Sequence, residues 1–152
     1  MSSSDHSGIT SPTGISHVRL TVTDIARSKA FYRHLVGADP AFDFSDQAGD
    51  PGVRDDPERL YGGCVFALGS QLLGLRPVAA PGDRFDSTRV GLDHVSLALD
   101  SLDALEAAAG RLRDSGIVHG EINKLEQGMA ILSVQDPDDI NLELSVPLPS
   151  DS

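Results

Sequence analysis

Apolar and polar residues alternate in two stretches of the chain that match one another. Residues 15–22 read Ile-Ser-His-Val-Arg-Leu-Thr-Val, and residues 92–99 read Leu-Asp-His-Val-Ser-Leu-Ala-Leu. Alternation of this kind is typical of a strand with one buried face. Each stretch runs directly into a segment of helical periodicity, so the pattern predicts an internal repeat in which a strand is followed by a helix.

The first repeat unit is predicted to contain four strands and one helix. The strands are expected at 15–23, 41–44, 63–68 and 71–76. The helix is expected at 25–36, with Asp24 as its N-cap and Gly37 as a left-handed stop. Residues 45–60 are polar, acidic and interrupted by prolines, and they predict a long loop. A binding loop and a merely solvated insertion both explain such a segment.

The second unit repeats this order after a linker at 80–89, which contains Pro81 and Gly82. Its strands are expected at 90–99, 118–122, 128–135 and 140–146. Its helix is expected at 102–114 and follows a good N-cap residue, Ser101.

The two units together predict one α+β domain over residues 14–147, with modules at 14–79 and 90–147. Neither module can bury both faces of its sheet alone. We therefore expect two tandem βαβββ modules that form one curved mixed sheet, with a concave cleft inside and the helices outside. Residues 1–13 and 148–152 are expected to be flexible tails.

Three metal-competent side chains fall on the polar faces of the predicted strands. His17 and His94 occupy the same place in the two copies of the repeat, and Glu143 lies on the last strand. The apolar faces are the natural partners of the helices, so the polar faces should line the cleft. Alternation fixes the face of each side chain, but it does not by itself bring the three together.

Two imidazoles and one carboxylate form a ligand set for a divalent ion. This set is associated with non-haem Fe(II) and can also hold Zn, Mn or Ni, with open coordination positions left for a substrate. The simpler explanation of a lone histidine or glutamate on a polar strand face is that it is solvated. Two histidines at matched repeat positions make the metal hypothesis about as good as that explanation.

Other polar residues flank the predicted ligands. Arg19 and Ser96 follow the two histidines by two positions, so they are candidates for substrate binding, as are Met129 and Ser133. A surface ion pair explains Arg19 equally well, and packing is the better explanation of Met129. His119 is a candidate acid or base beside Glu143, although a solvated strand face is the more common situation for such a residue.

The chain resembles the vicinal-oxygen-chelate superfamily, which includes glyoxalase I, bleomycin-resistance proteins and extradiol dioxygenases. The motifs that carry the resemblance are Ser16-His17-Val18, Asp24, Arg27-Ser28, Phe31-Tyr32 and Gly37 in the first half, and Asp93-His94-Val95, Asp136-Pro137-Asp138 and Leu142-Glu143-Leu144 in the second. The resemblance covers about residues 14–147. It says little about the reaction, because one fold hosts many chemistries.

The resemblance implies a metal bound in the concave sheet by residues on the first and last strands of each module. These family positions match His17, His94 and Glu143, and the fourth matches Gly74, which has no side chain to donate. Enzymes of the glyoxalase I type carry a carboxylate at that fourth position, so the glycine disfavours a glyoxalase reaction. Extradiol dioxygenases use only the other three but carry a tyrosine where Ser133 stands here.

Composition excludes several kinds of partner. The formal charge of −11 repels nucleic acid and anionic membranes, and no apolar run approaches the length of a membrane span. The N-terminal residues do not resemble a secretory signal, so we expect a cytoplasmic protein. The single cysteine, Cys64, excludes an internal disulfide and lies in an apolar run, where a buried core residue is the favoured interpretation.

Two functions therefore compete at the level of sequence. The first is a divalent-metal-dependent enzyme that acts on a small organic molecule with vicinal oxygens, by isomerase, lyase or dioxygenase chemistry. The second is a metal-free protein that binds or sequesters a small molecule, as the bleomycin-resistance relatives do. The retained ligand set favours the enzyme, and the resemblance implies a homodimer.

Overall fold

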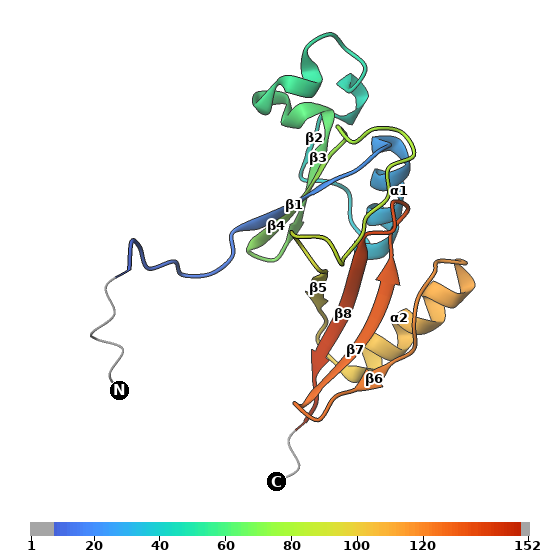
Figure 1. Ribbon diagram of the computed structural model, residues 1–152. Helices are drawn as coiled ribbons and strands as arrows, with labels where there is room; N and C mark the ends of the chain where they lie inside the picture. Colours follow the sequence, from blue (N-terminus) through green and yellow to red (C-terminus); the bar gives the residue numbers. More distant parts are fainter. Residues whose placement is uncertain (1–7, 150–152) are drawn as a thin grey trace.

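The computed structural model describes residues 8–149 of the chain (Figure 1). The flexible tails predicted at 1–13 and 148–152 lie partly outside these described residues. The described part of the chain has no helix that is both long enough and apolar enough to cross a membrane.

The first module folds in the predicted order of strand, helix and three strands. Its elements are β1 (His17–Thr21), α1 (Ile25–Val36), β2 (Phe42–Asp43), β3 (Cys64–Leu68) and β4 (Gln71–Arg76). The strand order in the sheet is β1-β4-β3-β2, with β1 parallel to β4 and the other neighbours antiparallel. Strand β1 is therefore at an edge of this sheet.

The second module repeats this topology. Its elements are β5 (Val95–Ala98), α2 (Leu102–Asp114), β6 (Asn123–Lys124), β7 (Met129–Gln135) and β8 (Asn141–Pro147). The strand order is β5-β8-β7-β6, and β5 is the edge strand that corresponds to β1. The predicted α+β class and the tandem βαβββ modules are confirmed. Hydrogen bonds divide the predicted mixed sheet into two four-stranded sheets that do not close on each other within residues 8–149.

Both long helices have the bounds that their capping residues predict. The Asp24 side chain accepts a hydrogen bond from the backbone of Arg27 at 3.1 Å, and Gly37 ends α1 in a left-handed conformation at φ 71°. The Ser101 hydroxyl accepts a hydrogen bond from the backbone of Ala104 at 3.1 Å and begins α2. These caps satisfy backbone groups that a helix end would otherwise leave unpaired.

The predictions for two strands of the second module are wrong in part. The strand predicted at 90–99 is confined to Val95–Ala98, the residues that pair with β8 from Leu142 onward. The strand predicted at 118–122 is reduced to a single bridge between His119 and Val134, followed by the two-residue strand β6. Alternation in sequence predicts the face of a residue but does not ensure continuous pairing with a neighbouring strand.

The segment predicted as a loop at 45–60 is more ordered than expected. It contains three short 3₁₀ helices, η2 (Ser45–Gln47), η3 (Val53–Asp55) and η4 (Pro57–Gly62). Figure 1 shows these turns above the first sheet, beyond the strands β2 and β3.

The apolar face of each sheet packs against the helices, as the alternation predicts. On the first module Leu20 and Val22 are buried, and on the last strand Leu142 and Leu144 are buried. These residues belong to one core that runs through both modules. Cys64 is fully buried in this core, and burial raises the pKa of its thiol to about 12, which confirms the core interpretation of this cysteine.

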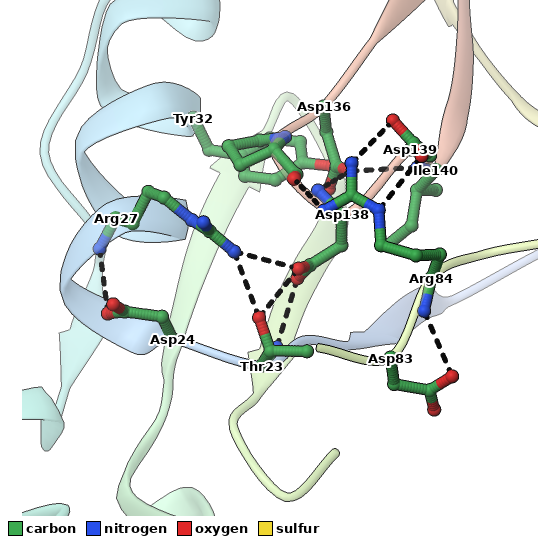
Figure 2. Close-up of polar contacts among 11 residues, drawn as sticks. Thr23, Asp24, Arg27, Tyr32, Asp83, Arg84, Asp136, Asp138, Asp139 and Ile140 are labelled. Atoms are coloured by element: carbon green, nitrogen blue, oxygen red, sulfur yellow. Dashed lines mark hydrogen bonds and ion pairs between the residues drawn. The ribbon is translucent and has the colours of Figure 1, made fainter. Parts of the chain in front are cut away.

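A buried polar network joins the two modules (Figure 2). The Tyr32 hydroxyl on α1 donates to the Asp136 carboxylate in the turn between β7 and β8 at 2.8 Å. The other Asp136 oxygen accepts from the backbone amides of Asp138 and Ile140, also at 2.8 Å. Burial raises the pKa of Asp136, although these three hydrogen bonds oppose the shift.

Asp138 in the same turn reaches back to the first module. Its carboxylate accepts from the backbone amide and the hydroxyl of Thr23 at 2.9 and 2.6 Å, and from the Arg27 guanidinium at 2.9 Å. Since Asp138 is almost fully buried, these bonds fix the first module against the turn. The linker adds an ion pair between Arg84 and Asp139 at 2.8 Å.

Candidate functional site

His17 lies on the open face of the first sheet, where alternation predicts it. Its Nδ1 is 3.0 Å from the Ser16 hydroxyl, so that nitrogen has a partner and Nε2 remains available. The side chain is exposed and lines a cavity of about 470 Å³. The first predicted ligand is therefore accessible and has one nitrogen free to bind.

The cavity beside His17 is mostly apolar. Its lining includes residues of β2, β3, β4 and η4, among them Phe42, Phe44, Leu60, Val65 and Leu72. Arg19 and Glu58 are the charged side chains in this lining. Arg19 pairs in register with Gly74, and a Cβ atom built on Gly74 would lie 3.3 Å from the Arg19 Nε. Gly74, which matches the fourth metal position of the family, is therefore partly covered by the Arg19 side chain.

His94 and Glu143 lie together on the open face of the second module. The His94 Nε2 is 3.7 Å from a Glu143 carboxylate oxygen, and the two side chains are 42% and 19% exposed. The His94 Nδ1 lies 2.6 Å from the Asp93 carboxylate. A carboxylate on one imidazole nitrogen holds the ring with its other nitrogen directed outward, as in many metal-binding histidines.

The geometry of this pair fits a divalent cation. Two ligand atoms that are each about 2.1 Å from one ion lie about 3 to 4 Å apart. The separation of His94 and Glu143 falls in this range. The donor types, a neutral imidazole and a carboxylate, suit Zn, Mn, Fe or Ni.

One chain does not bring all three predicted ligands together. The cavity that His17 lines includes neither His94 nor Glu143. Within residues 8–149, no group of three His, Cys, Asp or Glu side chains is placed so that it could hold a metal ion. The donor set is thus divided between the two modules, with His17 on one open face and the His94–Glu143 pair on the other.

Two of the predicted substrate-binding residues neighbour Glu143. Ser96 and Ser133 are its register partners on β5 and β7, and the Ser96 hydroxyl donates to Ser145 at 2.8 Å. Met129 is 39% exposed and lies at the far end of β7, where it pairs with Pro147. The two serines are therefore close to the pair of predicted ligands, whereas Met129 is remote from it.

His119 lies on the other side of the strand from Glu143. It pairs with Val134, whose side chain is buried, while the neighbouring Ser133 shares the face of Glu143. The His119 Nδ1 also contacts the backbone oxygen of Gly120 at 2.7 Å. A role for His119 as acid or base stays a prediction that this placement does not favour.

Several residues of the site were not expected from the sequence. Asp93 directly precedes His94 and contacts its imidazole. The sequence could have indicated this positioning role, because an acid stands next to a candidate metal-binding histidine. Leu60 in the cavity wall comes from the segment at 45–60 whose order was underestimated, whereas Phe42 and Phe44 belong to the strand predicted at 41–44. Phe42 is 59% exposed, which the alternation of so short a strand does not predict.

Two tandem βαβββ modules with histidines at matched positions define a duplicated α+β fold whose open sheet faces carry the polar residues. The family model of the glyoxalase/bleomycin resistance protein/dioxygenase superfamily matches residues 14–144. The chain belongs to this superfamily, as the resemblance of its motifs predicts. The comparison with curated proteins finds no match.

Solved structures of this superfamily share the fold. A glyoxylase/bleomycin resistance protein/dioxygenase domain from Frankia sp. EAN1pec has a TM-score of 0.68 at 27% identity, over 90% of this chain and 93% of its own. The fosfomycin resistance protein FosX from Listeria monocytogenes gives 0.63 at 16% identity, over 90% and 94%. Lactoylglutathione lyase from Agrobacterium tumefaciens gives 0.61 at 17% identity, over 90% and 96%. The last two likenesses show the fold alone.

Proposed function

We propose that this protein is a divalent-metal-dependent enzyme that acts on a small organic molecule with vicinal oxygens. We further propose that it works as a homodimer, in which His17 of one copy meets His94 and Glu143 of the other. The observation that carries this proposal is that the three candidate ligands are divided between the modules, with His17 in the cavity of the first and the His94–Glu143 pair on the second.

The edge strands support assembly with a second copy. β1 and β5 each lie at an edge of a four-stranded sheet, and an unpaired edge can accept another strand. Apolar residues before these strands are exposed, with Ile15 at 68% and Leu92 at 45%. A two-fold axis that brings β1 of one copy beside β5 of the other would cover these residues and create two equal sites.

The orientation of both histidines supports metal binding. Ser16 and Asp93, the residues directly before them, each hold the Nδ1 nitrogen. Both imidazoles can therefore present Nε2 as a ligand in the same way. A hydrogen bond that fixes the tautomer of a histidine also makes its other nitrogen a better donor to a metal.

The residues around the ligand set suggest how a substrate would be handled. A bound divalent ion would supply a Lewis acid for two neighbouring substrate oxygens. Glu143 is partly exposed, so its carboxylate can hold or pass a proton at the site. The hydroxyls of Ser96 and Ser133 can hydrogen-bond to substrate oxygens, and the apolar cavity wall can exclude water from the rest of the substrate.

A metal-free binding protein is the second candidate function. It is favoured by the cavity of about 470 Å³, because its largely apolar lining belongs entirely to the first module and does not depend on a metal. In that case the two histidines would be ordinary polar residues of the open faces.

Metal titration distinguishes the two functions. The chelator-treated protein is offered Fe(II), Mn, Ni and Zn separately, and bound metal is measured by elemental analysis. We expect uptake of about one ion per chain, lost in His94→Ala and in His17→Ala. His34→Ala is the matched control, because His34 lies on α1 and contacts Ser115 instead. An absence of specific uptake, or equal uptake by all three variants, would contradict the metal-dependent function.

A further inference from the structure

Arg19 places a positive charge without an ion-pair partner in the described part of the chain in the cavity beside His17. Its side chain is exposed on the open face of β1 and lines the cavity next to His17. Among residues 8–149, other arginines form ion pairs with Asp138, Asp39 and Asp139, but Arg19 has no carboxylate partner within 4.0 Å. A guanidinium in a largely apolar cavity, with no carboxylate within ion-pairing distance, is available to an anionic ligand.

Arg19 and a second arginine, Arg76, both lie beside the ring of Tyr61. The guanidinium of Arg76 stacks on the Tyr61 ring at 3.7 Å from its centroid, and that of Arg19 lies 5.6 Å from the same centroid. Register explains this grouping, because β1 and β4 run in parallel and place Arg19 and Arg76 on one sheet face. The Arg76 Nε is buried without a hydrogen-bond partner in the described residues. The ring of Tyr61 therefore has cations beside it and lies next to the cavity wall.

The segment that carries Tyr61 is strained. Leu60 and Tyr61 both adopt left-handed backbone conformations, at φ 50° and 58°, which residues other than glycine rarely adopt. Leu60 forms part of the cavity lining. Backbone strain of this kind persists only where the surroundings hold it, and it concentrates at binding sites. The contacts of Tyr61 with the two arginines are the interactions that would hold it here.

We propose that this cavity binds an organic oxyanion with an apolar body, and that the Arg19 guanidinium takes the charged group. The aromatic and aliphatic wall formed by Phe42, Phe44 and Leu72 contacts the apolar body. The inference deepens the proposed function by naming a substrate class for the same site. The cavity lining belongs to the first module, so its binding test needs no metal.

Glu58 is the residue that opposes this assignment. It lines the same cavity and carries a negative charge, but its side chain is exposed. Charges in contact with solvent are strongly screened. We therefore expect Glu58 to weaken anion binding only slightly and Glu58→Gln to strengthen it slightly.

Three probes of nearly equal shape test the charge preference. Benzoate, neutral benzamide and cationic benzamidine are titrated into the chelator-treated full chain, and affinity is measured by calorimetry or ligand-observed NMR. Benzoate is expected to bind about tenfold or more tightly than the other two, as a charge-assisted pair with arginine predicts. Phenylphosphonate, titrated in parallel, tells whether a carboxylate or a phosphonate is the better oxyanion.

Variants locate the binding to Arg19. Arg19→Met is expected to remove the preference for benzoate, whereas Arg19→Lys keeps part of it because it retains the charge. The control is Arg113→Met, which makes the same charge change at an exposed position in the last turn of α2. The wild-type preference should also fall at high salt.

Three outcomes overturn the inference. They are equal or tighter binding of benzamide or benzamidine, no binding of either oxyanion, and an unchanged affinity for benzoate in Arg19→Met. If Arg19-dependent binding is found but metal uptake is not, the proposed metal-dependent function fails while the oxyanion site remains. If metal binds but the oxyanions do not, only the present inference fails.

Discussion

At the scale of single residues, the chemistry of the site depends on which nitrogen of each histidine is free. The residue before each histidine engages Nδ1, through a hydroxyl from Ser16 and a carboxylate from Asp93. A carboxylate partner stabilises the orientation of an imidazole more than a hydroxyl does. Within the proposed ligand set, His94 is therefore the histidine that is better prepared to bind.

Removing the carboxylate that holds His94 should weaken the metal site without removing any ligand. Asp93→Asn is expected to lower the affinity for a divalent ion by about tenfold to a hundredfold, as is found for partners of metal-binding histidines. A titration against a chelator of known affinity measures this change. Asp100→Asn, the same substitution at another exposed acid of this region, is the control. Equal affinities in the two variants would show that Asp93 has no positioning role.

The sequence predicts the sheet face on which each site residue lies, but it does not predict which of these residues approach one another. His17, Arg19 and Glu143 lie on the open faces because strand alternation is a local property. Whether His17 approaches Glu143 depends on how two sheets are arranged, and no local pattern contains that information. The contact between Arg19 and Tyr61 could not be predicted either, because it requires a strained turn that the sequence around Tyr61 does not indicate.

At the scale of elements, helix bounds were predictable and strand bounds were less so. The caps Asp24 and Ser101 act within a few residues, so α1 and α2 have the predicted limits. Strand β5 is shorter than predicted because its length depends on β8, which is distant in sequence. The segment 45–60 folds into 3₁₀ turns that its polar composition does not reveal.

The junction between α1 and the β7–β8 turn is expected to contribute strongly to stability. Tyr32→Phe removes the side-chain hydroxyl that donates to Asp136 and leaves a buried carboxylate with one partner fewer. We expect a loss of about 1 to 3 kcal/mol in the free energy of unfolding. Urea denaturation measures this loss as a lower midpoint at an unchanged slope.

The same substitution at the other tyrosine is the control for this junction. Tyr61→Phe keeps the ring that faces Arg19 and Arg76, and no hydrogen bond of its hydroxyl holds a buried group among the described residues. It should change the free energy of unfolding by about 0.5 kcal/mol or less. A Tyr32→Phe protein as stable as Tyr61→Phe would mean that Asp136 does not depend on the tyrosine hydroxyl.

At the scale of the whole molecule, the arrangement of the modules decides whether a site can form. The Tyr32–Asp136 and Thr23–Asp138 bonds join the two modules, and the cavity that His17 lines includes neither His94 nor Glu143. In the proposed function, the ligand set that duplication supplies is completed between two chains. The absence of any group of three candidate ligands within residues 8–149 agrees with this division.

The most direct test of this account is complementation between two defective copies. His17→Ala and His94→Ala chains carrying different tags are co-expressed, and the mixed dimer is isolated through both tags. If each site takes His17 from one copy and His94 from the other, the mixed dimer has one intact site and should bind about one ion, whereas each defective homodimer binds none tightly. A mixed dimer that binds no metal, beside a wild-type protein that binds about one ion per chain, would contradict a site shared between subunits.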